Sequence, residues 1–200
     1  MRYKLIEFLQ KRNPNVPAII YKLEAEKHRD LTVITRIWKE LSESLVLEDI
    51  YSGNLITENS FELNNNMSID HFIPWSFIGH NMIWNLTPTT KNINSRKNDN
   101  LPEWNEYFLK FAEQQYDMFT FLIKNKKYKK HLEDYFEIFK DLDINEITNH
   151  NKQINKEEFI YNLKICIHPL YQIAYNQGFK TWILEKSLVH KEIQKVKLTL

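Results

Sequence analysis

Three neighbouring stretches decide how this 200-residue sequence folds: IDHFIPWSF at residues 69–77, WNLTP at 84–88 and NINSRKNDNLP at 92–102. The first two are short, rich in apolar residues and bounded by turn residues, which predicts strands at about 68–74 and 84–89. Thr90 is a residue type that caps helix N-termini, so a short helix is expected from about 91 to 98. The succession of strand, strand and helix predicts a small ββα unit.

Apolar residues recur at helical spacing on both sides of this unit. One run lies within the first twelve residues, and a second extends from Val33 to Leu45. Three more runs follow the unit, at about 104–122, 132–142 and 159–173. Pro102 suits the first turn of the helix that follows it, and Gly178 is the expected stop of the last helix. These stripes predict helices that pack together as a core.

A short hairpin is expected just before the ββα unit, because Ser-Gly-Asn at 52–54 separates two short apolar segments. The chain as a whole is therefore expected to have an α+β fold that is mostly helical. We expect three parts: an N-terminal helical region at 1–46, the ββα core at 47–102 and a C-terminal helical region at 103–200.

Composition excludes several classes of protein. Cys166 is the single cysteine, so neither an internal disulfide nor a multi-cysteine zinc site is possible. No apolar run approaches the ~18 residues that a membrane helix needs. The first residues lack a signal-peptide core, so we expect a cytoplasmic protein without a membrane partner. The formal net charge is only +1, which means that nucleic-acid binding would use a local basic patch.

The candidate catalytic and metal-binding side chains lie where the predicted strands and helix meet. Asp70 and His71 are adjacent at the end of a predicted strand, where the chain bends and both side chains can approach one site. Mg²⁺ takes oxygen ligands and keeps several waters, so Asp70 and the amide oxygen of Asn94 are candidate ligands. Lys97 lies three residues after Asn94 and shares its helix face, which places a cation suited to a phosphate beside the metal.

This arrangement resembles the HNH (ββα-metal) endonuclease family. The resemblance covers about residues 47–102 and rests on three motifs in order: DH-x-x-P-x-S-F, N-L and N-x-x-K-x-D-N-x-P. His71 precedes Asn85 by 14 positions, and Asn85 precedes Asn94 by nine. The layout is closely similar to that of the HNH domain in the CRISPR RNA-guided DNA-cleaving effector. Asn94 stands at the last H of the family name, as in zinc-free relatives.

The resemblance implies a role for each motif residue. His71 would be the general base, since an imidazole with a pKa of about 6.5 can accept a proton from water near neutrality. Asn85 would hold His71 in the right tautomer and orientation. Asp70 and Asn94 would bind one Mg²⁺ or Mn²⁺, which would stabilise charge on the phosphate and on the leaving oxygen. Lys97 would contact the scissile phosphate, or else it is an ordinary solvated charge.

Many members of the family carry zinc knuckles around the ββα unit, and this chain departs from that pattern. The corresponding positions hold Asp49, Ser52, Thr90 and Ile93. We therefore expect no structural zinc. Packing by the flanking helices and by Tyr51, Ile56 and Trp75 would hold the unit together instead.

Further basic and imidazole side chains leave alternatives open. Lys91 and Arg96 are expected, with Lys97, to contact nucleic acid. The lysines between Lys124 and Lys130 either track a nucleic-acid backbone or form a solvated loop, and we favour the loop. His80 either approaches the metal or is a loop residue without a catalytic role, and we favour the second.

The function expected from these motifs is metal-dependent hydrolysis of phosphodiester bonds in DNA, in an effector of bacterial restriction or phage defence. One alternative is an RNA-cleaving or toxin-like nuclease, and another is a degenerate module that binds nucleic acid or protein. Expected partners are DNA or RNA, a second copy of the chain, or a defence-system protein such as an ATPase.

Overall fold

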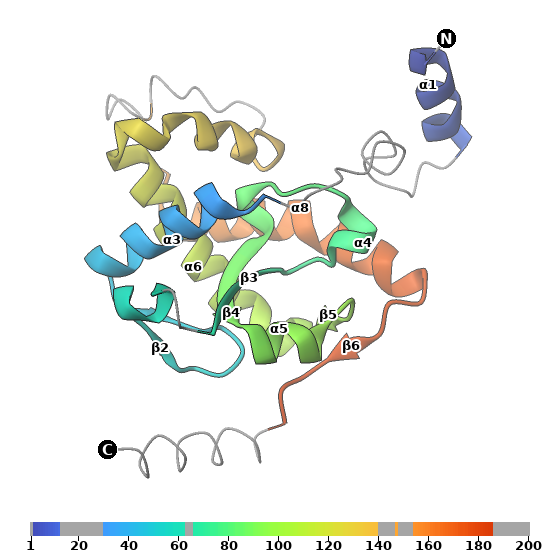
Figure 1. Cartoon of the computed structure of the whole chain (residues 1–200). Coiled ribbons are helices and arrows are strands. Elements are labelled where there is room, and N and C mark those ends of the chain that lie inside the picture. Colours follow the sequence, from blue (N-terminus) through green and yellow to red (C-terminus); the bar gives the residue numbers. More distant parts are fainter. Residues whose placement is uncertain (1, 13–29, 63–65, 140–146, 148–153, 186–200) are drawn as a thin grey trace.

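The computed structural model describes residues 2–12, 30–62, 66–139, 147 and 154–185. Its elements run through the chain in the order shown in Figure 1: α1 Arg2–Arg12, α3 Thr32–Ser44, β1 Leu47–Glu48, β2 Leu55–Ile56, 3₁₀ helix η1 Glu58–Phe61, β3 Met67–His71, α4 Trp75–Ile78, 3₁₀ helix η2 Ile83–Asn85, β4 Leu86–Thr90, α5 Lys91–Lys97, β5 Leu101–Pro102, α6 Trp104–Lys124, 3₁₀ helix η3 Lys126–Glu137, α8 Lys156–Asn176 and β6 Thr181–Trp182. The fold is α+β and mostly helical, as the sequence predicts.

The predicted ββα unit is present and consists of β3, β4 and α5. The two strands pair antiparallel, and the register sets Asp70 opposite Thr87 and His71 opposite Leu86. Thr90 begins α5 as its N-cap, because its hydroxyl accepts a hydrogen bond from the backbone N–H of Ile93. The last two residues of β3 therefore lie where strand, loop and helix meet, as expected.

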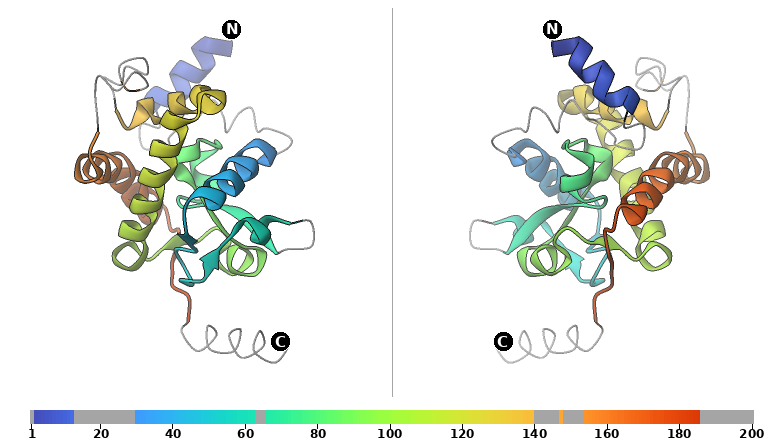
Figure 2. Two further views of the ribbon diagram at one scale, coloured as in Figure 1. Left: turned by 90° about the vertical axis from the view of Figure 1, so that its left-hand side faces the viewer. Right: turned by 90° about the vertical axis from the view of Figure 1, so that its right-hand side faces the viewer.

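Helix α6 lies between the ββα unit and α8 (Figure 2) and carries two glutamines that bind strand β4. Gln114 accepts a hydrogen bond from the hydroxyl of Thr87 at 2.6 Å and donates one to the backbone oxygen of Glu48 at 2.9 Å. Gln115 donates to the backbone oxygen of Leu86 at 2.6 Å. These buried amides therefore fix the position of β4 against α6.

An aromatic core holds the end of β3 in place. Phe72, directly after His71, is fully buried and stacks on Phe111 of α6 with ring centroids 4.1 Å apart. Trp104 and Phe108 stack on one another at the same spacing, and both also contact Phe72 edge-on. Burying an aromatic ring stabilises a fold by several kcal/mol. The backbone at His71 is thus anchored by its neighbour in the core.

The N-terminal and hairpin predictions are confirmed in outline. Helix α1 covers the first apolar run, and α3 covers the second, although Val33 and Leu45 at the ends of that stripe are exposed. Strands β1 and β2 pair antiparallel around the turn that contains Ser-Gly-Asn. The hairpin is short because only two residues of each strand pair.

The prediction that Pro102 opens a helix is wrong. Pro102 belongs to β5, which pairs in parallel with β6 near the far end of the described chain. Helix α6 begins two residues later, where the Glu103 carboxylate accepts a hydrogen bond from the backbone N–H of Glu106. A proline lacks an N–H to donate, which is tolerated in a two-residue edge strand as well as in a first helical turn.

The run at 132–142 predicted an α-helix, and the structure shows instead the 3₁₀ helix η3 up to Glu137; residues 140–142 of the run lie outside the described residues. Leu132, Tyr135 and Ile138 are all buried and follow one another at intervals of three, the period of a 3₁₀ helix. In contrast, α8 runs continuously through Pro169 to Asn176, and Gly178 follows with φ at 97°. None of the helices in the described ranges combines the length and apolar character needed to cross a bilayer.

Candidate active site

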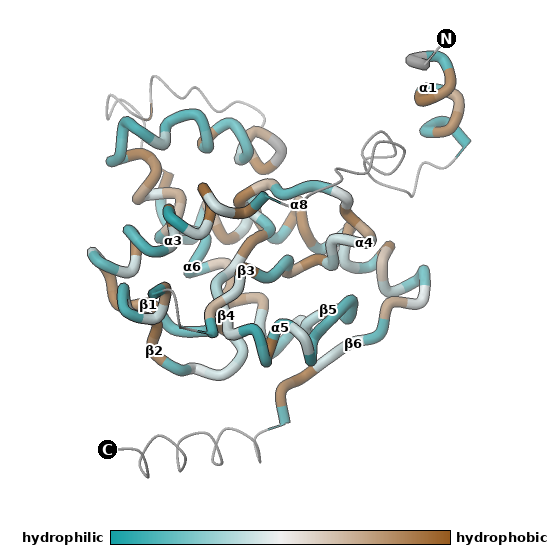
Figure 3. Tube along the Cα trace, in the orientation of Figure 1, coloured by the Kyte–Doolittle hydropathy of each residue, from teal (hydrophilic) through white to brown (hydrophobic). Residues whose placement is uncertain are grey.

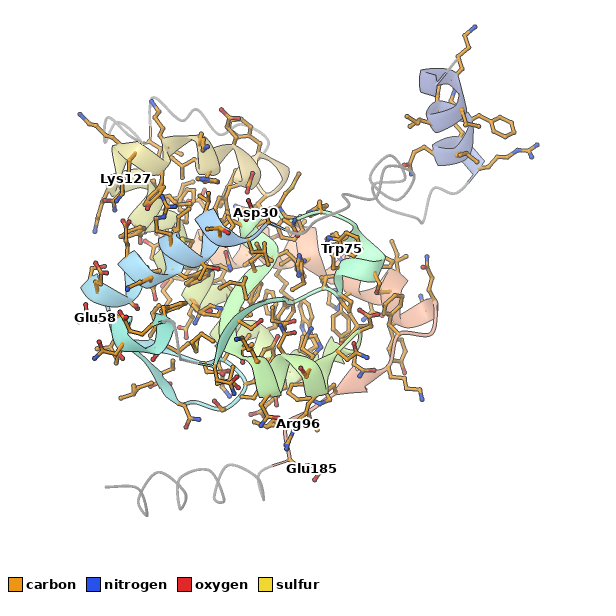
Figure 4. All side chains as sticks on the ribbon, in the orientation of Figure 1. Asp30, Glu58, Trp75, Arg96, Lys127 and Glu185 are labelled. Carbon is orange, nitrogen blue, oxygen red and sulfur yellow. The ribbon has the colours of Figure 1, made fainter. Side chains whose placement is uncertain are left out.

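The end of β3, the start of α4 and the C-terminal half of α5 enclose a pocket of about 230 Å³. Its lining includes Asp70 and His71 from β3 and Asn94 and Lys97 from α5. The structure therefore brings together four of the residues that the sequence singles out for chemistry. Trp75, from the first turn of α4, forms part of the rim and is labelled in Figure 4.

Asp70 is buried inside a network of charge and hydrogen bonds. Its Oδ2 accepts a hydrogen bond of 2.6 Å from the hydroxyl of Tyr51. The ammonium of Lys97 lies 3.1 Å from Oδ1 and 3.0 Å from Oδ2. Burial raises the pKa of the Asp70 carboxyl, while the charge of Lys97 and hydrogen bonds with Tyr51, Lys97 and the His71 backbone act in the opposite direction. The hydroxyl of Tyr51 stays protonated, because burial raises its pKa well above the ordinary value.

Lys97 points into the protein. It is fully buried, and besides its bond to Asp70 its Nζ donates a second hydrogen bond, at 2.8 Å, to the backbone oxygen of His71. A buried ammonium is costly unless charge and hydrogen bonds compensate it, and here Asp70 and the His71 carbonyl do so. In this geometry Lys97 fixes the two residues at the end of β3. A contact between Lys97 and a phosphate stays a prediction.

His71 is buried at the wall of the pocket, and its ring is held by a residue that sequence analysis missed. The Nε2 atom lies 3.0 Å from Oδ1 of Asn81, in the loop between α4 and η2. Asn81 occupies no periodic position and belongs to none of the motifs. Its sequence signal is its place next to His80 in the loop between the two predicted strands.

Asn85 has a different set of partners from the one predicted for it. Its Oδ1 accepts a hydrogen bond from the backbone N–H of Ile73 at 2.8 Å, and its Nδ2 donates to the Ile73 oxygen at 2.9 Å. Its own backbone oxygen accepts from the N–H of Phe72. Asn85 thus holds the backbone next to His71 through hydrogen bonds. The side chain that contacts the imidazole ring is that of Asn81.

Asn94 lies on the face of α5 that lines the pocket. Its Nδ2 donates to the hydroxyl of Ser68 at 2.8 Å and contacts the backbone oxygen of Ile69 at 3.5 Å. The amide is therefore oriented by β3 through its nitrogen, and the oxygen is the end of the amide that can serve as a metal ligand.

The oxygen atoms of Asp70 and Asn94 are the candidate metal ligands in this pocket. Across the described residues there is no group of three or more histidine, cysteine, aspartate or glutamate side chains placed to hold an ion. Asp70 and Asn94 offer one carboxylate and one amide oxygen in a polar pocket. Such a pair fits Mg²⁺ or Mn²⁺, which take hard oxygen ligands and complete their shells with water and substrate phosphate.

The other basic side chains lie away from this pocket. Lys91 and Arg96 are exposed on α5, and neither lines it; Arg96 points outward from the molecule (Figure 4). In η3, whose trace is largely hydrophilic (Figure 3), Lys127 pairs with Glu40 at 2.6 Å. This pairing favours the interpretation of the lysine-rich segment as a solvated surface.

His80 lies in the loop after α4, where its ring contacts neighbouring residues of that loop and of η2. Its Nδ1 accepts a hydrogen bond from the backbone N–H of Met82 at 3.3 Å, and its ring meets Trp84 edge-on at 5.5 Å. Burial, with a smaller contribution from nearby His71, lowers the pKa of His80 to about 4. His80 is therefore neutral near pH 7 and supports the loop that carries Asn81.

Asp49, which the sequence resemblance sets at one of the expected zinc-knuckle positions, joins the hairpin turn to the ββα unit. Its Oδ1 accepts hydrogen bonds from the backbone N–H groups of Tyr51 and Ser52. Its Oδ2 accepts from the hydroxyl of Thr89 on β4 at 2.7 Å. This buried carboxylate therefore ties the turn to strand β4. Tyr51 and Ile56 are buried as predicted, whereas Trp75 is only half-buried.

Residues 49–103 match the family model described as HNH endonuclease. No curated protein and no solved structure matches the chain. The likeness to the CRISPR effector stays a prediction. The matched segment contains the strand pair, helix α5 and the pocket residues Asp70, His71, Asn94 and Lys97. Residues 49–103 are thus similar to the HNH endonuclease family, and the similarity covers the ββα unit and its pocket.

Proposed function

We propose that this protein is a metal-dependent endonuclease that hydrolyses phosphodiester bonds in DNA. The observation that carries the proposal is the convergence of Asp70, His71 and Asn94 on one polar pocket inside the family-matched segment. A carboxylate, an imidazole and an amide oxygen are the groups that a metal-assisted attack of water on phosphorus requires.

His71 is the general base in this proposal. Its neutral imidazole takes a proton from water as the water oxygen forms a bond to phosphorus. The bond from phosphorus to the 3′ oxygen breaks on the opposite side. That oxygen takes a proton from solvent and leaves as a 3′-hydroxyl, the other fragment carries the 5′-phosphate, and His71 returns its proton to solvent. The base is positioned on a strand end whose backbone is held by Phe72 in the core and by Lys97 at the His71 carbonyl.

Asp70 and Asn94 are the residues that would hold Mg²⁺ or Mn²⁺. When bound, the ion stabilises negative charge on the phosphate and on the leaving oxygen. Tyr51 and Lys97 orient the Asp70 carboxylate through hydrogen bonds, and Ser68 orients the Asn94 amide. These contacts hold the oxygen ligands in place before substrate arrives, which lowers the reorganisation that the reaction requires.

DNA is proposed as the substrate from the family resemblance, and RNA is the alternative that the test must separate. Recognition of a 2′-hydroxyl is what distinguishes RNA, and the proposed roles of the pocket residues address only the phosphodiester. The net charge of +1 leaves the chain without strong general attraction to a polyanion. Target selection is therefore assigned to a second copy or to a partner protein, such as an ATPase of a bacterial restriction or phage-defence system, in the cytoplasm.

The test incubates the full-length protein with supercoiled plasmid, linear duplex DNA and single-stranded RNA in Mg²⁺ or Mn²⁺. We expect DNA nicking or linearisation that EDTA abolishes. His71→Ala should lower the rate by about 10²–10⁴-fold, while the control His168→Gln, on α8, cleaves normally. Products should carry 5′-phosphates that ligase can seal.

Cleavage of RNA alone would replace DNA as the substrate. Plasmid cleavage at the wild-type rate by pure His71→Ala protein would overturn the assignment of the base. Failure of the folded wild-type protein to cut any of these substrates in either metal would count against the nuclease proposal.

A further inference from the structure

The Nε2 atom of the His71 ring lies 3.0 Å from Oδ1 of the Asn81 amide. We propose that Asn81 is the positioning residue for the base, holding the neutral imidazole of His71 as the Nε2–H tautomer with its basic lone pair on Nδ1. The inference rests on the proposed nuclease function and assigns to Asn81 the part that the motif gives to Asn85.

The tautomer follows from the chemistry of the two groups. A neutral imidazole carries a hydrogen on one ring nitrogen and a lone pair on the other. An amide oxygen only accepts hydrogen bonds, so the nitrogen that faces it must carry the hydrogen. With Oδ1 of Asn81 facing Nε2 of His71, the proton-accepting nitrogen is Nδ1. Asn81 therefore fixes both the tautomer and the rotation of the ring.

Asn81 can perform this role because the loop that carries it is tied on both sides. Gly79 ends α4 in the left-handed conformation, with φ at 75° and its N–H bonded to the oxygen of Trp75. After Asn81, the Met82 N–H binds the ring of His80, and the Met82 oxygen accepts from the Asn85 N–H at 3.0 Å. The position of the Asn81 amide is thus set by hydrogen bonds on either side of it.

Asn85 supports the same loop without being assigned a contact to the base. Its side chain holds both backbone polar groups of Ile73, which closes the segment that begins just after His71. The two asparagines therefore have separable effects. Loss of the fully buried Asn85 amide should lower stability, whereas loss of the half-buried Asn81 amide should change the tautomer of His71.

The experiment is long-range ¹H–¹⁵N NMR of the full-length protein with ¹⁵N-labelled histidine. Spectra are recorded at about pH 8.5, where an imidazole with an ordinary pKa of about 6.5 is neutral. His71→Gln identifies the His71 signals by their loss. We expect wild-type His71 to be the Nε2–H tautomer. Asn81→Asp keeps an oxygen acceptor and should keep that tautomer, and so should the control Asn54→Ala, an exposed asparagine in the β1–β2 turn.

Asn81→Ala should give a mixture of tautomers and slow single-turnover plasmid cleavage at least about tenfold, because general base catalysis contributes 10²–10⁴-fold. Its melting temperature should fall by less than about 4 °C, since one half-buried hydrogen bond is lost. A wild-type His71 in the Nδ1–H form would overturn the proposal. So would Asn81→Ala protein that cleaves at the wild-type rate or keeps the wild-type tautomer.

The two proposals fail in different ways. The tautomer of wild-type His71 is measured without substrate, so it tests the Asn81 contact even in a protein that cuts nothing. Absence of cleavage by the wild-type protein would contradict the nuclease proposal, and the NMR spectrum would still decide whether Asn81 fixes the ring.

Discussion

The ammonium of Lys97 lies 3.0 Å from Oδ2 of Asp70, and both side chains are almost completely buried, with 1% and 5% exposed. A cation and a carboxylate in such a place stabilise one another because water does not screen them. The proposed metal ligand therefore has an internal counterion supplied by the fold. This pair links the stability of the ββα unit to the geometry of its pocket.

Replacing Lys97 with methionine should destabilise the protein by about 3–5 kcal/mol, because it leaves the Asp70 carboxylate buried without its cation. Chemical denaturation measures the change. Lys110→Met is the matched control, since Lys110 forms an exposed pair with Glu106 and its loss should cost no more than about 1 kcal/mol. Equal and small effects from both substitutions would show that the Lys97–Asp70 pair is not buried as described.

His80 should make stability depend on pH in the acid range. Its pKa is about 4 in the folded chain, against an ordinary value of 6.5. Between these values the unfolded chain binds the proton more tightly, so a fall in pH favours unfolding. The loss should reach up to about 3 kcal/mol by pH 4.

Comparison with His80→Asn isolates this contribution, because asparagine can still accept the hydrogen bond of Met82 but does not titrate. The free energy of unfolding of the wild-type protein should fall more steeply than that of the variant as pH drops from 6.5 toward 4. Parallel curves for the two proteins would contradict the assignment of the low pKa to His80.

Thr89→Val tests the connection between the hairpin turn and β4. Valine matches threonine in shape but cannot donate to the buried Oδ2 of Asp49, so we expect a loss of about 1–3 kcal/mol in the free energy of unfolding. Thr181→Val, at an exposed position in β6, should change it by less than about 0.5 kcal/mol. If Thr89→Val is as stable as the wild type, Asp49 does not hold the turn through this bond.

Local patterns predicted the ββα unit and the pocket because the relevant residues are close in sequence. Asp70 and His71 share a strand end, and Asn94 faces them because a strand and its following helix pack together. Thr90 was recognisable as a cap from its residue type alone. The boundaries between the three expected parts of the chain stay a prediction.

Other features depend on contacts that sequence spacing does not reveal. The spacing of three residues predicted that Lys97 lies on the same helix face as Asn94. It does not predict that the Lys97 side chain is fully buried. Asn81 meets His71 only because the loop between α4 and η2 folds back on the strand. Pro102 is a strand residue because it pairs with Trp182, some 80 positions away, and no local pattern records such a pairing.

The most direct test of the account is an anomalous difference map from crystals soaked in Mn²⁺. We predict one peak in the pocket between Asp70 and Asn94, about 2.1–2.3 Å from an oxygen of each, with His71 beside it. A protein that crystallises with this pocket intact but shows no manganese there, or binds it only elsewhere, would contradict the claim that these side chains form a metal-dependent catalytic centre.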